Sequence, residues 1–390
     1  MFLKNEKHNM ISLLQKYVSL PSVSNNNDGN DELNLAKEIK DTFNGFNIRN
    51  TILGDKSTGI SVKGTVGFAE KGILFNCPLD TTPEGDPDKW KYAPYDGTIR
   101  GGKMYGRETA DAKAGMVSMI YAAYALKKFI SEDEFRIELV FDGGEQTGEY
   151  SGMKQLIKRH ALDVEAGIIG YADNTDNEVA IGARGYHRYK FTTKGFAHHT
   201  GSRNKKGINA ISHAAKVVGY IESIKIPNGD NPLFPFGSRM TVSMIQGGKA
   251  INIVPDECSI FVDIRTVPEV TKKDIDRLIE SKIIEIKNEV VDIDLDYEYL
   301  DGKEGYYLSP EYKIVKSITN ARNNLYKSDT LLVANGPAHI GNLLFESNVP
   351  VIVRGPIGGN VHGYDEFVEI DSLLKTSELY VNTIINHFNS

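Results

Sequence analysis

The sequence predicts an α/β protein in which a largely parallel sheet is interrupted by an inserted α+β domain. Three observations lead to this fold class. The chain has 390 residues, which is enough for roughly two domains. Short apolar segments alternate with helical patterns in its first and last parts. Between these parts, from about residue 185 to 300, the pattern changes to long strands of alternating polarity.

The first part of the chain carries the strand–helix–strand order of a parallel sheet. Its N-terminal segment places apolar residues at helical spacing, for example at Met10, Leu14 and Val18. Later helices and apolar strands alternate, which predicts a sheet covered on both faces. The predicted elements are helices over residues 33–43, 112–129 and 152–159 and strands over 72–76, 136–141 and 166–170.

The middle of the chain has the β-α-β-β-α-β order of a ferredoxin-like split motif. The predicted strands cover 186–195, 239–248 and 258–267, and the helices cover 210–224 and 272–290. The α/β pattern then returns, with strands at 330–335 and 350–355 and a helix over 372–387. We therefore predict a first domain in two parts, 1–184 and 301–390, and an inserted domain over 185–300.

The composition of the chain limits the kinds of partner and cellular location that we expect. The net charge of −7 gives no electrostatic reason to expect a nucleic acid or an anionic membrane as partner. Only two cysteines occur, Cys77 and Cys258, which excludes a disulfide framework and favours a reducing cytoplasm. No run reaches the eighteen or so apolar residues that a membrane helix needs. We expect a cytoplasmic protein that binds a small molecule.

Polar side chains follow several predicted strands of the first domain: Asp80, Asp111, Glu145, Asp173 and His362. Taken singly, a loop carboxylate is more often a turn former or a solvated charge. Their shared position favours function, because open α/β sheets bind ligands at the carboxyl ends of their strands. A hydrolytic metal centre needs oxygen and imidazole ligands and a carboxylate base, and these are the right residue types.

A resemblance to a known family rests on motifs spread along the chain. The run "DPDKWKYAPYDGTIRGGKMYGRETADAKAGM" is followed in order by "GFAHHTG", "GINAI", "INIVPDECSIFVDIR", "GPIGG" and "HGYDEFV". Together they resemble metallopeptidase family 20, which includes acetylornithine deacetylase, succinyl-diaminopimelate desuccinylase and carboxypeptidase G. The resemblance implies a zinc-peptidase-like catalytic domain with a mixed, mostly parallel sheet, and an inserted ferredoxin-like lid that forms a homodimer.

The resemblance also implies two zinc ions, and this sequence departs from that pattern. Asp111 matches the aspartate that bridges the ions and His362 matches the last histidine ligand. Pro78 stands in place of the first histidine, Gln146 in place of a glutamate, and Tyr171 in place of a carboxylate. Because catalytic zinc needs about three protein ligands, we expect no metal or one weakly bound divalent ion. Asp173, two residues after Tyr171, is a weak substitute ligand.

The remaining site residues follow from the same resemblance. Glu145 matches the general base and Asp80 a second catalytic carboxylate, while Tyr171 and Gln146 would donate hydrogen bonds to a substrate carbonyl. His199 matches a lid histidine that stabilises the oxyanion. The residues matched to substrate binding are Asn252 and Arg265, which would hold a carboxylate, and Gly358 in the pocket wall. The alternatives for the lid residues are a surface histidine, a turn asparagine and a salt-bridged arginine.

Two functions from different classes are compatible with these residues. The first is an enzyme that acts on the amide bond of a small N-acyl amino acid or dipeptide, by residual one-metal hydrolysis or by metal-free acyl transfer, condensation or proton transfer. The second is an inactive homologue that binds an amino acid derivative or serves as a dimeric regulatory protein. A shifted register, in which Asp142, Asp173 or His339 rebuilds the ligand set, is also left open.

Overall fold

The computed structural model describes residues 2–23, 31–55, 58–203 and 207–389, which form two compact units. Unit 1 comprises Met1–Ile181, Leu308–Val333 and His339–Ser390. Unit 2 comprises Gly182–Tyr307 and Ala334–Ala338. The sequence placed the insertion at 185–300, so unit 2 is longer at both ends and also takes in a short segment that returns from later in the chain.

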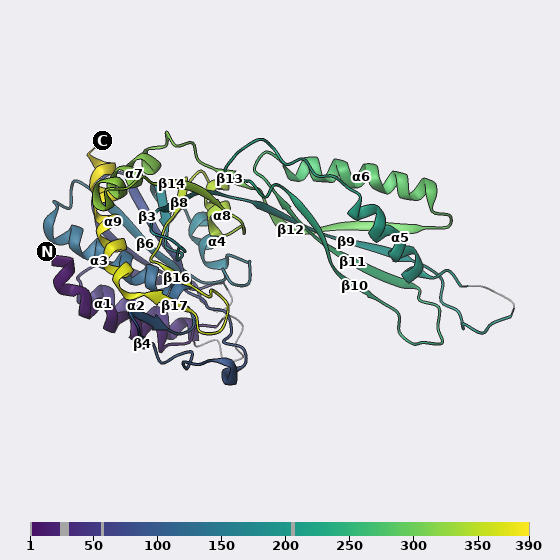
Figure 1. The fold of residues 1–390 in the computed structure, drawn as a ribbon, viewed down its shortest axis with the longest axis horizontal. Helices are drawn as coiled ribbons and strands as arrows, with labels where there is room; N and C mark the ends of the chain where they lie inside the picture. The colour runs from purple at the N-terminus through teal and green to yellow at the C-terminus, as the bar shows by residue number, and fades with distance from the viewer. Residues whose placement is uncertain (1, 24–30, 56–57, 204–206, 390) are drawn as a thin grey trace. The chain divides into compact units, whose positions relative to one another are not determined.

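Unit 1 is built on a mixed sheet with the strand order β1-β2-β6-β3-β7-β15-β8 (Figure 1). The four central strands β6, β3, β7 and β15 are parallel, whereas β1, β2 and β8 pair antiparallel at the flanks. The predicted mixed sheet is confirmed, and its parallel part is confined to the centre. The bounds are β1 Arg49–Leu53, β2 Ser61–Gly67, β3 Gly72–Pro78, β6 Arg136–Asp142, β7 Val164–Ile169, β8 Glu178–Ala183 and β15 Val351–Val353.

Helices cover this sheet. Helix α3 contacts β3 and β6, and α1 and α9 pack against α3. Most residues of α3 are buried, as its apolar sequence requires. The bounds are α1 Phe2–Val18, α2 Asp31–Gly45, α3 Ala114–Phe129, α4 Ser151–Lys158, α7 Lys313–Tyr326, α8 Ile340–Glu346 and α9 Ile370–Phe388. Within the described ranges, no helix combines the length and apolar character needed to cross a membrane.

A second, small sheet of unit 1 positions the site, and the sequence did not predict it. Its order is β16-β17-β5-β4, all antiparallel. Because Phe367 pairs with Tyr105, the residues after β5 lie beside the residues before β17. The bounds are β4 Thr98–Arg100, β5 Lys103–Tyr105, β16 Gly358–Gly359 and β17 Phe367–Glu369, with short helical turns at η1 Pro87–Lys89 and η2 Thr109–Lys113.

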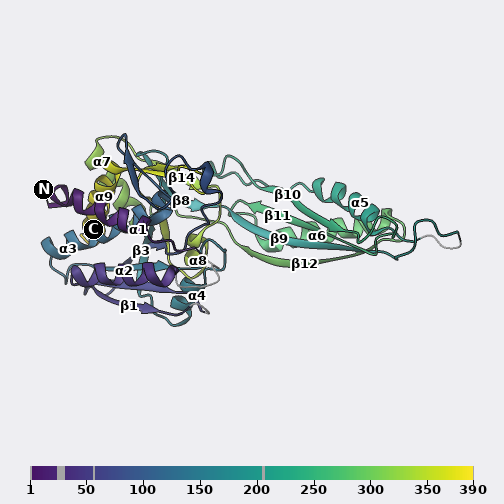
Figure 2. The ribbon, with the colours of Figure 1, turned by 90° about the horizontal axis from the view of Figure 1, so that it is seen from below.

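Unit 2 has an antiparallel sheet in the order β10-β11-β9-β12, with α5 and α6 on one face (Figures 1 and 2). This is the predicted ferredoxin-like arrangement, and it is confirmed. Its core lies between helices and sheet and includes Phe191, Val217 and Ile260. The bounds are β9 Gly185–Lys194, α5 Ala210–Glu222, β10 Arg239–Gly247, β11 Glu257–Thr266, α6 Lys272–Glu289 and β12 Asp294–Lys303. Two further short strands, β13 Tyr306–Tyr307 and β14 Leu331–Asn335, belong to the large sheet, where both pair with β8.

Candidate active site

The first part of the site lies where β3 and β6 end side by side. These parallel strands pair Pro78 with Asp142, so the loops that follow them meet. The buried Asp80 carboxylate accepts hydrogen bonds from the backbone N–H groups of Glu145 (3.1 Å) and Gln146 (2.9 Å). Asp80 therefore holds the loop that carries the predicted base, which makes it a positioning residue by geometry.

Glu145 is paired with a phenol from the next strand. Tyr171 follows β7, and its hydroxyl donates a hydrogen bond to Glu145 Oε1 (3.0 Å). Burial raises the pKa of Glu145 well above its usual range, and the nearby carboxylates of Asp111 and Asp80 raise it further. Burial also raises the pKa of Tyr171, so this phenol stays protonated and acts as the donor. The His339 ring lies edge-on to Tyr171, with 5.6 Å between ring centroids.

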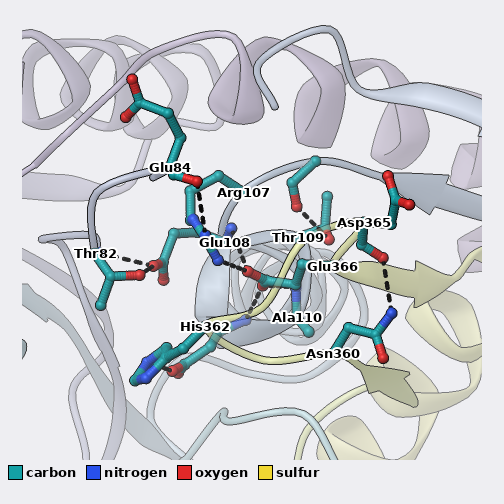
Figure 3. Close-up of polar contacts among 12 residues, drawn as sticks. Thr82, Glu84, Arg107, Glu108, Thr109, Ala110, Asn360, His362, Asp365 and Glu366 are labelled. Carbon is teal, nitrogen blue, oxygen red and sulfur yellow. Dashed lines mark hydrogen bonds and ion pairs between the residues drawn. The ribbon is translucent and has the colours of Figure 1, made fainter. Parts of the chain in front are cut away.

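The loop that carries Asp111 is held by one buried carboxylate. Glu366 accepts hydrogen bonds from the backbone N–H groups of Glu108 (3.0 Å), Ala110 (2.9 Å) and Asp111 (3.1 Å). It also forms an ion pair with Arg107 (3.0 Å), as Figure 3 shows. Four donors on one carboxylate fix the backbone beside Asp111.

The two predicted ligands that match the family are bonded to each other. His362 Nε2 lies 3.0 Å from Asp111 Oδ2. This hydrogen bond raises the pKa of the His362 imidazole, since it stabilises the protonated ring. The His362 side chain is 52% exposed and its backbone has a φ of 61°, a left-handed conformation that aims the ring at Asp111.

The donor set does not fit a pair of metal ions. Pro78 has no donor atom, and the Tyr171 phenol is protonated and bonded to Glu145. Gln146 offers only a neutral amide, and its buried Nε2 has no hydrogen-bond partner among the described residues. In the described ranges, no three His, Cys, Asp or Glu side chains are grouped as metal ligands. Zinc sites need about three such ligands, so the residues present do not supply the family's centre.

Asp173, the predicted weak substitute ligand, forms hydrogen bonds with the residues that follow another strand. Its carboxylate accepts hydrogen bonds from Arg354 Nη1 (3.0 Å) and from the backbone N–H of Gly355 (3.1 Å). Burial raises the pKa of Asp173 to about 7, although the Arg354 guanidinium opposes the shift. Asp173 is therefore engaged by a buried arginine in this structure, and its role as a substitute ligand stays a prediction.

The other two side chains proposed for a shifted register are also engaged in the fold. Asp142 accepts a hydrogen bond from Asn76 Nδ2 (2.6 Å), and burial raises its pKa to about 8. His339 caps α8, where its Nδ1 accepts the N–H of Gly341 (3.0 Å). Burial lowers the pKa of His339 to about 4, so the ring is neutral. Neither residue completes a ligand set with Asp111.

Gly358 lies in the small sheet next to the Asp111 loop. A Cβ atom at this position would approach the Phe367 carbonyl oxygen to 2.7 Å and Ala110 Cβ to 2.8 Å. No residue larger than glycine fits there without movement of the backbone. Its predicted role in the pocket wall stays a prediction.

Three predicted residues lie in unit 2. His199 is exposed, and its neighbour Thr200 donates its backbone N–H to the carbonyl of Asn252 (3.1 Å), so these two loops lie together. The Arg265 guanidinium, on β11, is held by both carboxylate oxygens of Asp263 (2.6 and 3.2 Å). Arg265 is therefore salt-bridged in this structure, and the substrate roles of all three remain predictions.

Sequence analysis missed two carboxylates that shape the site. Glu366 stands inside the motif "HGYDEFV", and Glu108 inside "GRETADAKAG". Glu108 Oε1 accepts hydrogen bonds from the backbone N–H (2.9 Å) and hydroxyl (3.1 Å) of Thr82, which ties the Asp80 loop to the Asp111 loop. The sequence indicated these two glutamates only by their place within the motifs. Their roles could not be predicted, because both bind backbone N–H groups whose positions depend on the fold.

Comparison with known proteins agrees with this architecture. A model of peptidase family M20/M25/M40 matches residues 74–386. A Staphylococcus aureus protein named "probable succinyl-diaminopimelate desuccinylase" is 25% identical, over 97% of both chains. Aminopeptidase PepT from Bacillus cereus superposes with a TM-score of 0.78 at 20% identity, covering 98% of this chain and 99% of the other. A Bacillus subtilis structure described as a dinuclear metal binding peptidase gives a TM-score of 0.74 at 14% identity, covering 98% of each.

Proposed function

This chain belongs to peptidase family M20/M25/M40, and from that premise we propose that it acts on the amide bond of a small N-acyl amino acid or dipeptide-like compound without a pair of metal ions. The observation that carries the proposal is the hydrogen bond from Tyr171 to Glu145 (3.0 Å) at the end of the central strands. It places an acid–base carboxylate where sheets of this class bind ligands. The names of the relatives support the substrate class.

Glu145 supplies the acid–base step. Its Oε1 accepts the Tyr171 hydrogen bond, which leaves Oε2 to accept the proton of an attacking water or amine. The raised pKa of Glu145 suits a group that takes up a proton and later returns it to the leaving nitrogen. Asp80 holds the backbone of this loop through two hydrogen bonds, so the carboxylate is oriented before the ligand arrives.

Neutral hydrogen-bond donors polarise the substrate carbonyl in this proposal. The Gln146 amide has a buried Nε2 that lacks a partner in the described structure, and such an atom is stabilised when it donates a hydrogen bond to a ligand oxygen. A donor of this kind stabilises a developing oxyanion less than zinc does, but it needs no metal. In a family member with a full ligand set, bound zinc would polarise the carbonyl and lower the pKa of water. Here Asp111 and His362 are the retained members of that set.

Recognition of the substrate carboxylate and dimerisation are assigned to unit 2. We propose that Arg265 and Asn252 bind the carboxylate, and that His199 acts in a homodimer. Arginine suits this task because its planar guanidinium binds a carboxylate through two hydrogen bonds. The same carboxylate geometry is already present between Arg265 and Asp263, so a ligand would have to displace or share that contact.

The test is turnover of a panel of N-acyl amino acids and dipeptides by Glu145→Gln and by a matched control. Loss of the base lowers catalysis by about 10²–10⁴-fold. Glu149→Gln removes an exposed carboxylate from the same loop and should leave activity unchanged. Equal activity of wild-type protein and Glu145→Gln would overturn the proposal, and the unfolding curves of both variants would show that they are folded.

A second function, a binding or regulatory protein, is favoured by a different observation. Pro78, Gln146 and Tyr171 all stand where the family has ligands. A protein without turnover tolerates such losses, provided that the pocket still binds its ligand. This candidate predicts no product from any compound in the panel, together with binding of an amino acid derivative that Glu145→Gln retains by calorimetry.

A further inference from the structure

The hairpin loop that carries His362 has an unusual backbone. It joins β16 to β17 and covers residues 360–366, and we call it the His362 loop. Three of its residues that are not glycine have left-handed backbones: Asn360 (φ 56°), His362 (φ 61°) and Asp365 (φ 53°). Such conformations are costly for residues with a side chain and persist only where the surrounding structure fixes them. Contacts with the rest of unit 1 are therefore needed to place the His362 ring.

Hydrogen bonds inside the His362 loop close its turn without anchoring it. The backbone N–H of Gly363 donates to the carbonyl of Asn360 (2.8 Å). Figure 3 shows that Asn360 Nδ2 donates in turn to the carbonyl of Asp365 (3.2 Å). Both bonds join residues of the same loop, so they shape the loop but do not fix its position on the unit.

The Asp365 side chain anchors the loop to a distant segment. Its Oδ1 accepts hydrogen bonds from the backbone N–H groups of Lys91 (2.9 Å) and Tyr92 (3.2 Å), which lie 274 and 273 positions earlier in the chain. The next residue, Glu366, binds the backbone of the loop that carries Asp111. Two successive carboxylates therefore attach the His362 loop to two separate segments, one of which carries Asp111.

The segment that donates to Asp365 is itself held in place. Trp90 Nε1 donates to the carbonyl of Glu84 (2.9 Å), and Trp90 is buried. The Trp90 ring lies edge-on to Tyr364 of the His362 loop, with 6.0 Å between ring centroids. The Arg107 guanidinium carbon lies 4.9 Å from the centre of the Trp90 ring. This segment is therefore a firm support for the His362 loop.

We propose that Asp365 is a positioning residue that sets the His362 ring against Asp111. Within the described ranges, the His362 side chain has one hydrogen-bond partner, Asp111 Oδ2 (3.0 Å), and it is 52% exposed, so packing holds it only in part. Both donors to Asp365 are neutral backbone groups, so its role needs an acceptor oxygen and not a negative charge. This role rests on the proposed function, which counts the Asp111–His362 pair as part of the site.

The rate at which diethyl pyrocarbonate acylates His362, measured by peptide mass spectrometry, tests this role. His362 Nε2 is bonded to Asp111, and loss of one ordinary hydrogen bond should raise the rate about fivefold. Asp365→Gly removes the acceptor and suits the left-handed backbone, so we expect this rise. Asp365→Asn keeps an acceptor oxygen and should restore the wild-type rate. The exposed His160 is the internal reference and should react equally in all variants.

Asn360→Gly is the matched control. It places a glycine at another left-handed position of the same loop and leaves both hydrogen bonds of the Asp365 side chain intact. Its acylation rate should stay within about twofold of the wild-type rate. Two results would overturn the proposal: an unchanged rate in Asp365→Gly, or an equal rise in Asn360→Gly. Thermal unfolding of each variant shows that the compared proteins are folded.

Turnover of the compound panel gives a second measurement. Asp365→Gly should lower turnover about fivefold and Asp365→Asn should restore it, because the same two hydrogen bonds are lost and regained. A loss that Asp365→Asn does not restore would contradict the proposal. Acylation does not depend on turnover. Failure of the proposed function, seen as full activity of Glu145→Gln, is thus separate from failure of the anchor, seen as an unchanged acylation rate in Asp365→Gly.

Discussion

The strand-end site of unit 1 and the end of the unit 2 sheet where Arg239 pairs with Arg265 hold charge in opposite ways. In unit 1, Asp80 and Glu366 are buried and their carboxylates are stabilised by backbone N–H groups. In unit 2, Arg239 is exposed and stands opposite another arginine. Charge in the first region is therefore part of the fold, whereas the Arg239 side chain in the second is exposed to solvent. Substitutions should separate the two regions by their effects on stability and on binding.

The largest effect on stability is expected for Glu366→Ala. This change leaves the buried Arg107 without its partner and three backbone N–H groups without an acceptor. Removal of one member of a buried ion pair costs about 3–5 kcal/mol of unfolding free energy. Urea denaturation measures the loss. Glu369→Ala, in the strand β17 that begins directly after Glu366, is the control, and an equal loss in both variants would show that Glu366 has no special role.

The pH dependence of stability should follow Asp142. Burial raises its pKa to about 8 in the folded protein, from an ordinary value near 4 in the unfolded chain. The folded state then holds a proton that the unfolded state has lost, so this residue lowers the unfolding free energy as pH rises from about 4 to 8. The slope is at most about 1.4 kcal/mol per pH unit. Asp142→Asn should flatten this decline, and an unchanged slope would contradict the assignment.

Tyr171→Phe should have a moderate effect that appears in the pH–rate profile. It removes one hydrogen bond, worth about 1 kcal/mol, from Glu145. Because this bond lowers the pKa of Glu145, its loss should move the acid limb of the profile to higher pH. Steady-state kinetics across pH measures the shift. A limb that stays in place would show that Tyr171 does not act on the base.

Arg239→Gln should have the smallest effect on the fold. The side chain is exposed and faces Arg265, so the change in unfolding free energy should stay within about 0.5 kcal/mol. Thermal unfolding checks this expectation. A large destabilisation would mean that Arg239 belongs to the fold and would remove the contrast between the two regions.

The sequence predicted long elements well because their periodicity is strong. The strands and helices of unit 2, such as β9 and α6, run for many residues with clear alternation or helical spacing. The small sheet of unit 1 was not predictable, since β16 has only two residues and β5 three. Strands this short give no pattern, and their pairing depends on segments far apart in the chain.

The candidate site was predicted only in part, because its contacts also join segments far apart in the chain. Asp111, Glu145 and His362 were found by motif, and the structure brings Glu145 and Tyr171 together, and Asp111 and His362 together. The bond between Asp111 and His362 could not be read from residues 251 positions apart. The bond between Asp173 and Arg354 could not be predicted either, because Arg354 follows a different strand, β15.

We propose that the strand-end site works without a pair of metal ions. Metal analysis by mass spectrometry of protein purified from zinc-supplemented medium tests it most directly, with turnover measured before and after a chelator. We expect less than one zinc ion per chain and turnover that the chelator leaves unchanged. Two ions per chain, lost together with activity on chelation, would contradict it.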